Sequence, residues 1–269
     1  MIYVTGSSGL IGSVLCKKID CQKITYRDDV SLVEFSSEEN NSTLIHLASC
    51  SNTRFKMSSA EELLQKEVLT SLDLFRKFYK ANPKGRIIFL SSCGDLHWRY
   101  SDGPLRLNET YAPTPRTVHG SNKVLIENYG NILSKESGGK FISLRVSNVY
   151  GGKIDSNRIN GLVDRYYYCL ENDEPMKIYC NPENTYDWIH IDDVVDCIIK
   201  ATKHHRSSTY IVGSEESLSV RDVLNHLCKT KGKIDIEYQK VKERATYVKI
   251  TSGMAHIDLG WKPKHSLKK

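Results

Sequence analysis

The sequence lacks several features that would assign it to a protein class at once. Its eight cysteines form no CxxC pair and no metal-ligand spacing, so we expect neither a disulfide framework nor a bound metal. No apolar run is long enough to cross a bilayer. The net charge of +6 is spread along the chain, without a basic cluster interleaved with aromatics. We therefore predict a protein with neither a membrane nor a nucleic acid as its partner.

The composition is typical of a folded globular protein. The 269 residues are 39% hydrophobic and 26% charged, which allows a large buried core. There is no internal repeat and no low-complexity linker. The first predicted strand begins with the first residues, which leaves no room for a targeting peptide, so we expect a cytoplasmic protein.

What the chain does contain is a glycine-rich turn near its N-terminus. Residues 2–4 are typical of a short buried strand, and apolar residues at helical spacing begin at position 10. Glycines in such a turn let backbone amides approach a pyrophosphate, whose charge the helix N-terminus favours. We predict that this turn binds a dinucleotide through Gly6, Ser8, Gly9, Leu10, Ile11 and Gly12.

Strand and helix signals alternate after this turn. Such alternation predicts parallel βαβ units and, with right-handed crossovers, a doubly wound α/β sheet of the Rossmann type. The predicted strands are 23–27, 43–47, 86–91, 140–146, 176–179, 188–191 and 209–212. The predicted helices are 60–79, 120–134, 158–171, 193–203 and 220–228.

The alternation becomes less regular after residue 150. We predict a dinucleotide-binding domain over residues 1–149, to which residues 187–213 return. A smaller, interwoven C-terminal lobe over 150–186 and 214–269 is expected to bind the substrate.

Several short segments together resemble one family. They are GSSGLIG (6–12), IHLA (45–48), FLSS (89–92), LRVSNVYG (144–151), DWIHIDDVV (187–195) and LGWKP (259–263). On these motifs the chain resembles the extended short-chain dehydrogenase/reductase family, which includes sugar-nucleotide epimerases, dehydratases and 4-ketoreductases.

The resemblance implies a catalytic group of three residues, with one departure. Members use a Ser or Thr, a Tyr, and a Lys four residues after the Tyr; here Ser92 and Lys123 match, but His119 occupies the tyrosine position. Glu67 replaces the family's helix asparagine. Neutral imidazole is a competent base, but the Lys123 ammonium disfavours the imidazolium needed to protonate a ketone.

The resemblance also implies contacts with cofactor and substrate. Arg27 lies where the second strand ends and favours NADP(H), whereas a shift of one residue would place Asp28 there and favour NAD(H). Further residues expected to bind the cofactor are Leu47, Ala48 and Lys123. Ser92, Asn148 and Arg244 are expected to bind a nucleotide-sugar substrate, although Tyr186 replaces another family arginine.

Three functions are compatible with these residues. The first is an NADP(H)-dependent oxidoreductase that reduces a nucleoside-diphosphate 4-keto-6-deoxy sugar in carbohydrate biosynthesis. The second is an NAD-dependent nucleotide-sugar 4-epimerase. The third is a catalytically degenerate dinucleotide-binding subunit, which the histidine at position 119 would explain. By analogy with relatives we expect a homodimer formed through the helices 60–79 and 120–134.

Overall fold

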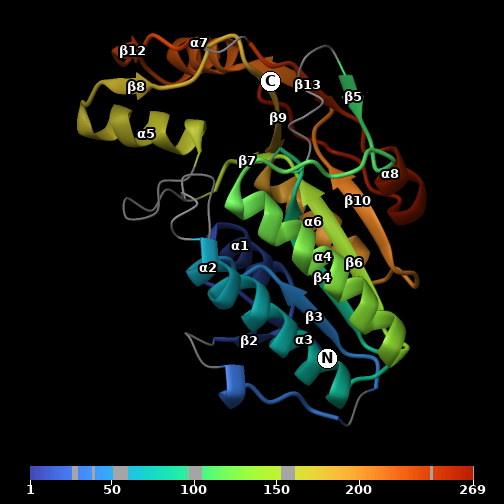
Figure 1. The fold of residues 1–269 in the computed structure, drawn as a ribbon. Helices are drawn as coiled ribbons and strands as arrows, with labels where there is room; N and C mark the ends of the chain where they lie inside the picture. The colour runs from blue at the N-terminus through green and yellow to red at the C-terminus, as the bar shows by residue number, and fades with distance from the viewer. Residues whose placement is uncertain are drawn as a thin grey trace.

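A computed structural model describes most of the chain. The described residues are 1–25, 30–37, 40–50, 60–94, 96, 105–152, 161–242 and 245–268. A sheet flanked by helices forms the larger part of the molecule, and α5, α7, β8 and β12 lie together at one end of it (Figure 1). Among the described residues, no helix combines the length and the hydropathy needed to span a bilayer.

The central sheet has six strands, all parallel, in the order β10-β6-β4-β3-β1-β2. This confirms the predicted doubly wound α/β fold. The chain passes from β1 to β2 on one side and later returns to place β3 on the other side of β1, so the carboxyl ends of β1 and β3 flank a topological switch point. The strands are β1 (Ile2–Thr5), β2 (Gln22–Ile24), β3 (Thr43–His46), β4 (Arg86–Ser92), β6 (Lys140–Val146) and β10 (Ser208–Val212).

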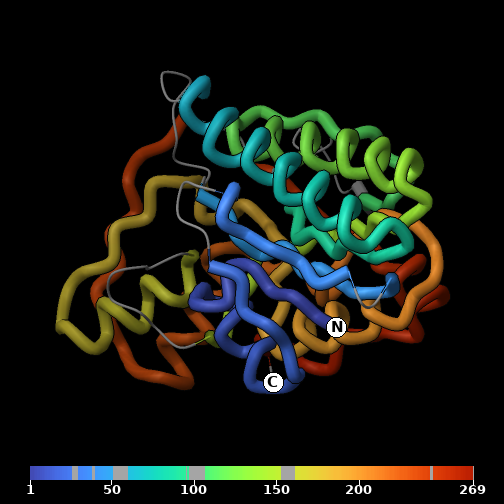
Figure 2. The backbone as a smooth tube through the Cα atoms, turned by 90° about the horizontal axis from the view of Figure 1, so that it is seen from below, coloured from blue at the N-terminus to red at the C-terminus, as the bar shows by residue number. Residues whose placement is uncertain are grey.

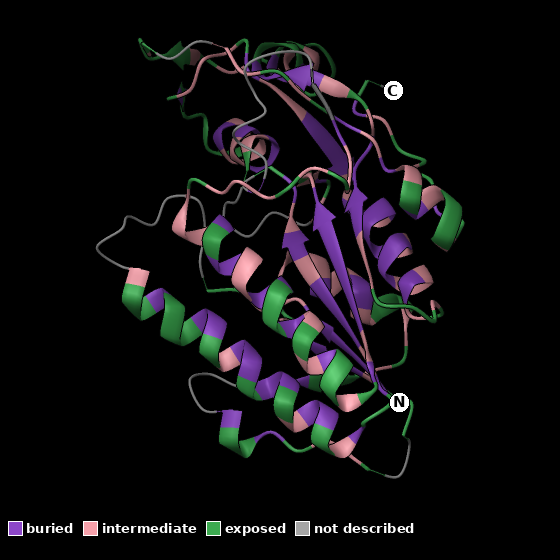
Figure 3. Ribbon diagram, turned by 45° about the vertical axis from the view of Figure 1, so that its right-hand side comes forward, coloured by how far each residue is buried: buried purple, intermediate pink, exposed green. Residues whose placement is uncertain are grey.

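Neighbouring residues of these strands enter two separate cores, because successive side chains of a strand point to opposite faces. Val4, Ile45 and Ile88 pack on the face covered by α1 (Leu10–Lys18) and α6 (Ile191–Ala201). Tyr3, Leu44 and Phe89 pack on the face covered by α3 (Thr70–Ala81) and α4 (Val118–Ser137). Figure 2 shows α3 and α4 side by side on one side of the sheet. Figure 3 shows the buried strands of the sheet between helices along which buried and exposed residues alternate. Burial on both faces explains why the strands read as nearly continuous apolar runs.

The helix predicted over 60–79 is not a regular α-helix. It begins as α2 (Ala60–Leu63), widens into a π-helical turn, η3 (Leu64–Leu69), and continues as α3 to Ala81. Apolar spacing does not reveal one wide turn within a long helix, and such turns are frequent at functional sites.

The remaining strands are short and form three further sheets. A three-stranded sheet joins β7 (Asn148–Tyr150), β9 (Thr185–His190) and β11 (Ser217–Ser219). The two-stranded sheets pair β8 (Met176–Ile178) with β12 (Ile236–Tyr238), and β5 (Leu105–Leu107) with β13 (Val248–Ile250). The other helices are the 3₁₀ helix η1 (Val30–Leu32), α5 (Leu162–Asn172), α7 (Val220–Thr230) and α8 (Gly253–Leu259).

These elements require several corrections to the predicted boundaries. The strand expected at 188–191 runs from Thr185 to His190, and the helix expected at 193–203 runs from Ile191 to Ala201. The strands β5, β7, β11, β12 and β13 and the helix α8 were not predicted, because segments of three to seven residues carry little periodicity.

A separate core holds the smaller elements together. Tyr166, Trp188 and Leu224 are buried in it, and the Trp188 indole donates a hydrogen bond to the Leu218 carbonyl at 3.2 Å. The C-terminal segment returns to α6, where the buried Trp261 indole donates to the Asp193 carbonyl at 2.9 Å. The last residues of the chain are thus joined to a helix that covers the central sheet.

Candidate active site

The glycine-rich turn forms a cradle between β1 and α1. Gly6 has φ +67°, a left-handed conformation that favours glycine, and its carbonyl accepts a hydrogen bond from the Gly9 amide at 3.0 Å. The helix then begins at Leu10 without a side-chain cap and with no acidic residue in its first turn. Its N-terminal amides can therefore bind an anion.

Two of the glycines are required by close backbone contacts. A Cβ atom on Gly12 would lie 2.1 Å from the Gly6 carbonyl oxygen, and one on Gly6 would lie 2.7 Å from the Ala48 amide nitrogen. The turns after β1 and β3 therefore touch at the switch point, where Leu47 and Ala48 follow β3. The predicted cofactor residues of these two turns, Ser8 and Ile11 included, lie together, in a shape that fits a dinucleotide phosphate group.

A chain of hydrogen bonds runs beneath the cradle. The Ala48 amide donates to Thr5 Oγ1 at 3.3 Å, Thr5 Oγ1 lies 2.8 Å from His46 Nδ1, and His46 Nε2 lies 3.0 Å from Ser71 Oγ. Because the Ser71 hydroxyl donates to the Glu67 carbonyl at 2.5 Å, it must accept from His46 Nε2–H. His46 is then neutral and accepts from Thr5. Burial, assisted by the Lys123 charge, lowers the pKa of His46 to about 3.

The predicted catalytic residues lie on adjacent elements. Ser92 ends β4, and α4 packs on that strand. Thr117 caps α4, and its hydroxyl accepts from the Gly120 amide at 2.9 Å. His119 and Lys123 stand one turn apart in the first part of α4. Lys123 is buried, and its Nζ lies 5.0 Å from the centre of the Phe89 ring on β4. The spacing of four residues therefore places His119 and Lys123 on one side of α4, and their catalytic roles with Ser92 stay a prediction.

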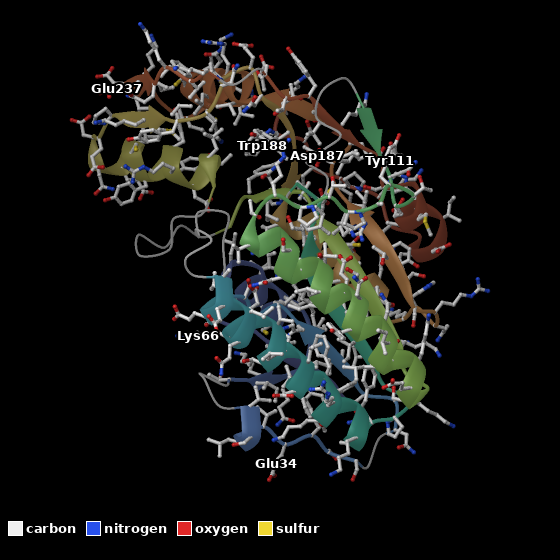
Figure 4. The ribbon with its side chains drawn as sticks, in the orientation of Figure 1. Glu34, Lys66, Tyr111, Asp187, Trp188 and Glu237 are labelled. Atoms are coloured by element: carbon white, nitrogen blue, oxygen red, sulfur yellow. The ribbon has the colours of Figure 1, made fainter. Side chains whose placement is uncertain are left out.

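Glu67 is the principal residue of the site whose role could not be read from the sequence. It lies on the π-helical turn η3, is 3% exposed, and its Oε1 is 3.4 Å from Lys123 Nζ. Ser49 donates to Glu67 Oε1 at 2.5 Å, and Asn122 donates to Oε2 at 3.4 Å. The neighbouring Lys66 points away from the protein (Figure 4) and pairs with Glu62. The available signal was the family resemblance, in which Glu67 replaces the helix asparagine.

The protonation of His119 is set by these surroundings. Burial and, to a smaller extent, the Lys123 ammonium lower the pKa of His119 to about 4, while the Glu67 carboxylate acts in the opposite direction. At neutral pH the imidazole is therefore mostly neutral. The expectation that Lys123 disfavours the imidazolium is confirmed in direction, but burial is the larger cause.

The predicted substrate residues are tested only in part. Asn148 lies at the exposed start of β7, and its amide donates to the Asp187 carbonyl at 3.1 Å. Arg27 and Arg244 lie outside the described residues, as does Asp28.

The motif around Asp187 and Trp188 has a structural role. Figure 4 places both residues where β9 meets the sheet region. Asp187 accepts from the Ser147 hydroxyl at 2.6 Å and from the Ser214 amide at 2.8 Å, and burial raises its pKa to about 6. Asp187 on β9 thus connects the segments that follow β6 and β10. The cap of α6 is His190, whose Nδ1 accepts from the Asp192 amide at 3.2 Å.

A second group of polar residues lies at the start of α6. His190, Asp192 and His265 offer ligand atoms within 4.8 Å of one another. However, the two imidazoles stack at 4.4 Å and 27°, so their in-plane lone pairs do not converge, and Asp192 already pairs with Lys18 at 2.6 Å. These contacts describe a junction between α1, α6 and the C-terminal segment.

Comparisons with known proteins agree with this geometry. The chain is 29% identical over 237 residues to the dTDP-4-dehydro-6-deoxyglucose reductase of Escherichia coli, with 86% of this chain and 73% of that protein covered. Its fold matches a solved UDP-glucose 4-epimerase from Thermotoga maritima, in complex with UDP-glucose, with a TM-score of 0.83, 23% identity, and 99% and 94% of the two chains covered. It also matches RMD from Pseudomonas aeruginosa, complexed with NADPH, with a TM-score of 0.82, 18% identity, and 99% and 94% covered.

The sequence profile of one family spans the central sheet and its cradle. The profile of the NAD dependent epimerase/dehydratase family matches residues 2–213, which run from β1 to the end of β10. This range contains the glycine cradle, Ser92 and Lys123. The expected family is thereby confirmed: the chain belongs to the NAD dependent epimerase/dehydratase family and is an NAD(P)-dependent enzyme of the extended short-chain dehydrogenase/reductase type.

Proposed function

We propose that the protein reduces the keto group of a nucleoside-diphosphate 4-keto-6-deoxy sugar with NADP(H), in activated-sugar and glycan biosynthesis. The observation that carries this proposal is the buried Lys123, whose Nζ lies 5.0 Å from the ring of Phe89 on β4, the strand that Ser92 ends, in a chain of the NAD dependent epimerase/dehydratase family. The similarity to a 4-keto-6-deoxy-sugar reductase favours reduction over the family's other reactions.

The residues of the chain divide the work of ketone reduction. A bound nicotinamide supplies the hydride that goes to the keto carbon, and the carbonyl oxygen must then gain a proton. Ser92 donates a hydrogen bond to that oxygen, and the His119 imidazolium gives up its proton to it. Lys123 binds the ribose hydroxyls, and the amides of the cradle from Gly6 to Gly12 bind the pyrophosphate.

The lowered pKa of His119 determines how the rate of this reaction depends on pH. Because the donor must be imidazolium, and the pKa of His119 is lowered to about 4, the protonated fraction rises as the pH falls from neutral toward 4. Reduction is therefore faster in mild acid than at pH 8, up to the point where the fold begins to open.

The lobe formed by residues 150–186 and 214–269 is the proposed binding site for the sugar nucleotide, to which Asn148 and Arg244 contribute. Residues 187–213 return to the dinucleotide domain.

The proposal also includes a cytoplasmic homodimer. Exposed apolar side chains on η3 and α4 support a helix-mediated dimer; they are Leu64, Leu69, Tyr129 and Ile132.

A different observation favours a non-catalytic alternative. The neutral His119 is a poor acid at neutral pH, which fits a subunit that binds a dinucleotide but no longer turns it over. A 4-epimerase that uses NAD is the second enzymatic alternative, and copurified stoichiometric NAD would support it.

Calorimetry and turnover on one preparation separate these functions. We expect NADPH to bind more tightly than NADH, and Gly12→Ala to weaken both, because the added Cβ would collide with the Gly6 carbonyl. A panel of 4-keto-6-deoxy sugar nucleotides, followed by NADPH absorbance, then tests reduction. Tight NADPH binding without turnover on any of them would favour the subunit, and the absence of binding heat with either cofactor would exclude a redox role.

A further inference from the structure

The site contains two departures from the family pattern, and the structure brings them to the same lysine. His119 stands where the family has tyrosine, and Glu67 stands where it has asparagine. His119 is one helical turn from Lys123 on α4, and the Glu67 carboxylate reaches Lys123 from η3, 3.4 Å from its Nζ. The two positions are 52 residues apart in the sequence and meet only through the packing of η3 on α4.

The charge at position 67 matters because the family's usual arrangement is unsuitable for histidine. A tyrosine beside an ammonium is helped, since its ionised form is an anion. An imidazole beside the same ammonium is hindered, since its ionised form is a cation. A carboxylate within contact of the ammonium offsets part of the positive charge that the imidazole experiences. Asparagine at position 67 could not do so.

We infer that Glu67 is a charge-balancing residue that enables histidine to replace tyrosine as the proton donor at position 119. This inference rests on the proposed reduction for its catalytic consequence but not for its electrostatic one. Glu67 acts through Lys123 and His119, and we place it among the positioning residues of the site.

Several observations support a carboxylate that is held ionised at this place. Glu67 is buried together with Lys123, and it accepts hydrogen bonds from Ser49 and Asn122, which are neutral donors that favour the charged form. The π-helical turn places Glu67 inward while Lys66 stays exposed.

Glu67 is a source of negative charge at His119 within the described part of the chain. Its carboxylate raises the pKa of His119, whereas the Lys123 ammonium lowers it. His46 on β3 and Cys50 after it face the same lysine and glutamate, and burial keeps both neutral at pH 7 by lowering the pKa of the histidine and raising that of the thiol. A change of charge at position 67 should therefore shift the pKa of His119.

The first test is an NMR titration of the full-length protein without ligand, with labelled histidine and with His119 assigned by its loss in His119→Gln. We expect Glu67→Gln to lower the His119 midpoint by roughly one pH unit. Glu62→Gln, which changes an exposed glutamate that pairs with Lys66 on the same helical segment, should leave the midpoint unchanged. An unchanged or raised midpoint in Glu67→Gln overturns the inference.

Two further variants keep the test decisive if Glu67→Gln folds poorly. Lys123→Met should raise the midpoint of the His119 titration. Glu67→Asp keeps the negative charge but places it farther from Lys123, because the side chain is shorter. Its midpoint should lie between those of Glu67→Gln and the natural protein. The inference fails if the aspartate variant matches the natural protein while Lys123→Met leaves His119 unmoved.

Turnover supplies a readout that a merely structural role would not produce. Glu67→Gln should slow reduction about tenfold at pH 6 when His119 is present. In the His119→Tyr background, Glu67→Gln should instead accelerate reduction. The Lys123 ammonium then lowers the pKa of the tyrosine without a neighbouring carboxylate to oppose it. Equal losses in both backgrounds would overturn the inference. Absence of turnover throughout, with the midpoint shifts intact, would instead refute the reductase and leave the charge balance standing.

Discussion

The helix α4 holds two buried ion pairs, and their difference separates the part of the molecule that fixes the fold from the part that performs chemistry. Near its middle, Glu127 binds Arg145 of β6, which we call the anchor pair. Near its start, Lys123 binds Glu67 of η3, which we call the site pair. Both pairs are shielded from water.

The anchor pair is short and complete. Arg145 Nη2 lies 2.7 Å from Glu127 Oε2, Arg145 Nε lies 3.1 and 3.2 Å from the two carboxylate oxygens, and the Ser143 hydroxyl donates to the same carboxylate at 2.8 Å. Planar guanidinium and carboxylate groups hold each other in one geometry. The anchor pair therefore fixes α4 on the sheet.

The site pair is longer and joins a flexible lysine to a carboxylate that has other donors. The Lys123–Glu67 distance is 3.4 Å, and Ser49 and Asn122 also bind the carboxylate. A lysine ammonium with rotatable donors can exchange one acceptor for another. The same helix thus carries a rigid pair for stability and a looser pair whose ammonium can donate to another oxygen.

The largest expected effect comes from breaking the anchor pair. Arg145→Met leaves Glu127 buried without its partner and should lower the free energy of unfolding by about 3–5 kcal/mol. Urea denaturation measures this loss. Arg76→Met, which removes an exposed pair with Asp73, is the control and should cost less than about 1 kcal/mol. Equal losses in the two variants would contradict the distinction.

Breaking the site pair should affect function more than stability. Lys123→Met should reduce turnover by about 10²-fold through loss of cofactor orientation and charge. Its loss of unfolding free energy should stay near 1–3 kcal/mol, less than that of Arg145→Met, because Glu67 keeps two hydrogen-bond donors and can take up a proton. Denaturation and steady-state kinetics on the same samples check both values. A stability loss as large as that of Arg145→Met would remove the difference between the two pairs.

Replacing the titrating group of the site should change its pH dependence. His119→Tyr should increase reduction at pH 7–8 by at least about tenfold, because a tyrosine keeps its acid form there while a histidine of pKa about 4 does not. The gain should disappear toward pH 5. A lower rate across the whole pH range would mean that the site is adapted to histidine alone.

A smaller effect of the same group is expected on stability. Above pH 6.5 His119 is neutral in both folded and unfolded chains; between 6.5 and about 4 only the unfolded chain takes up its proton, so stability is lost as the pH falls. The difference in unfolding free energy between the natural protein and His119→Tyr should change by about 2 kcal/mol from pH 7 to pH 4.5. The contribution of His46 to the pH dependence is the same in both proteins and therefore cancels in the difference. Parallel stability curves would contradict this account.

The sequence by itself determined the parts of this protein that depend on local spacing. The alternation of apolar segments predicted a parallel doubly wound sheet, and the glycines of residues 6–12 predicted the cradle, because strand, turn and helix follow within a dozen residues. The spacing of four between His119 and Lys123 likewise placed both on one side of a helix.

Only the tertiary structure decided how these parts act on one another. The contact of Glu67 with Lys123, the hydrogen bonds from Thr5 through His46 to Ser71, and the anchor pair all join segments far apart in the chain. Hydrophobic periodicity records which face of an element is buried but not which polar group it meets there. The identity of that partner depends on how helices and strands pack, and the protonation of His119 depends on that partner.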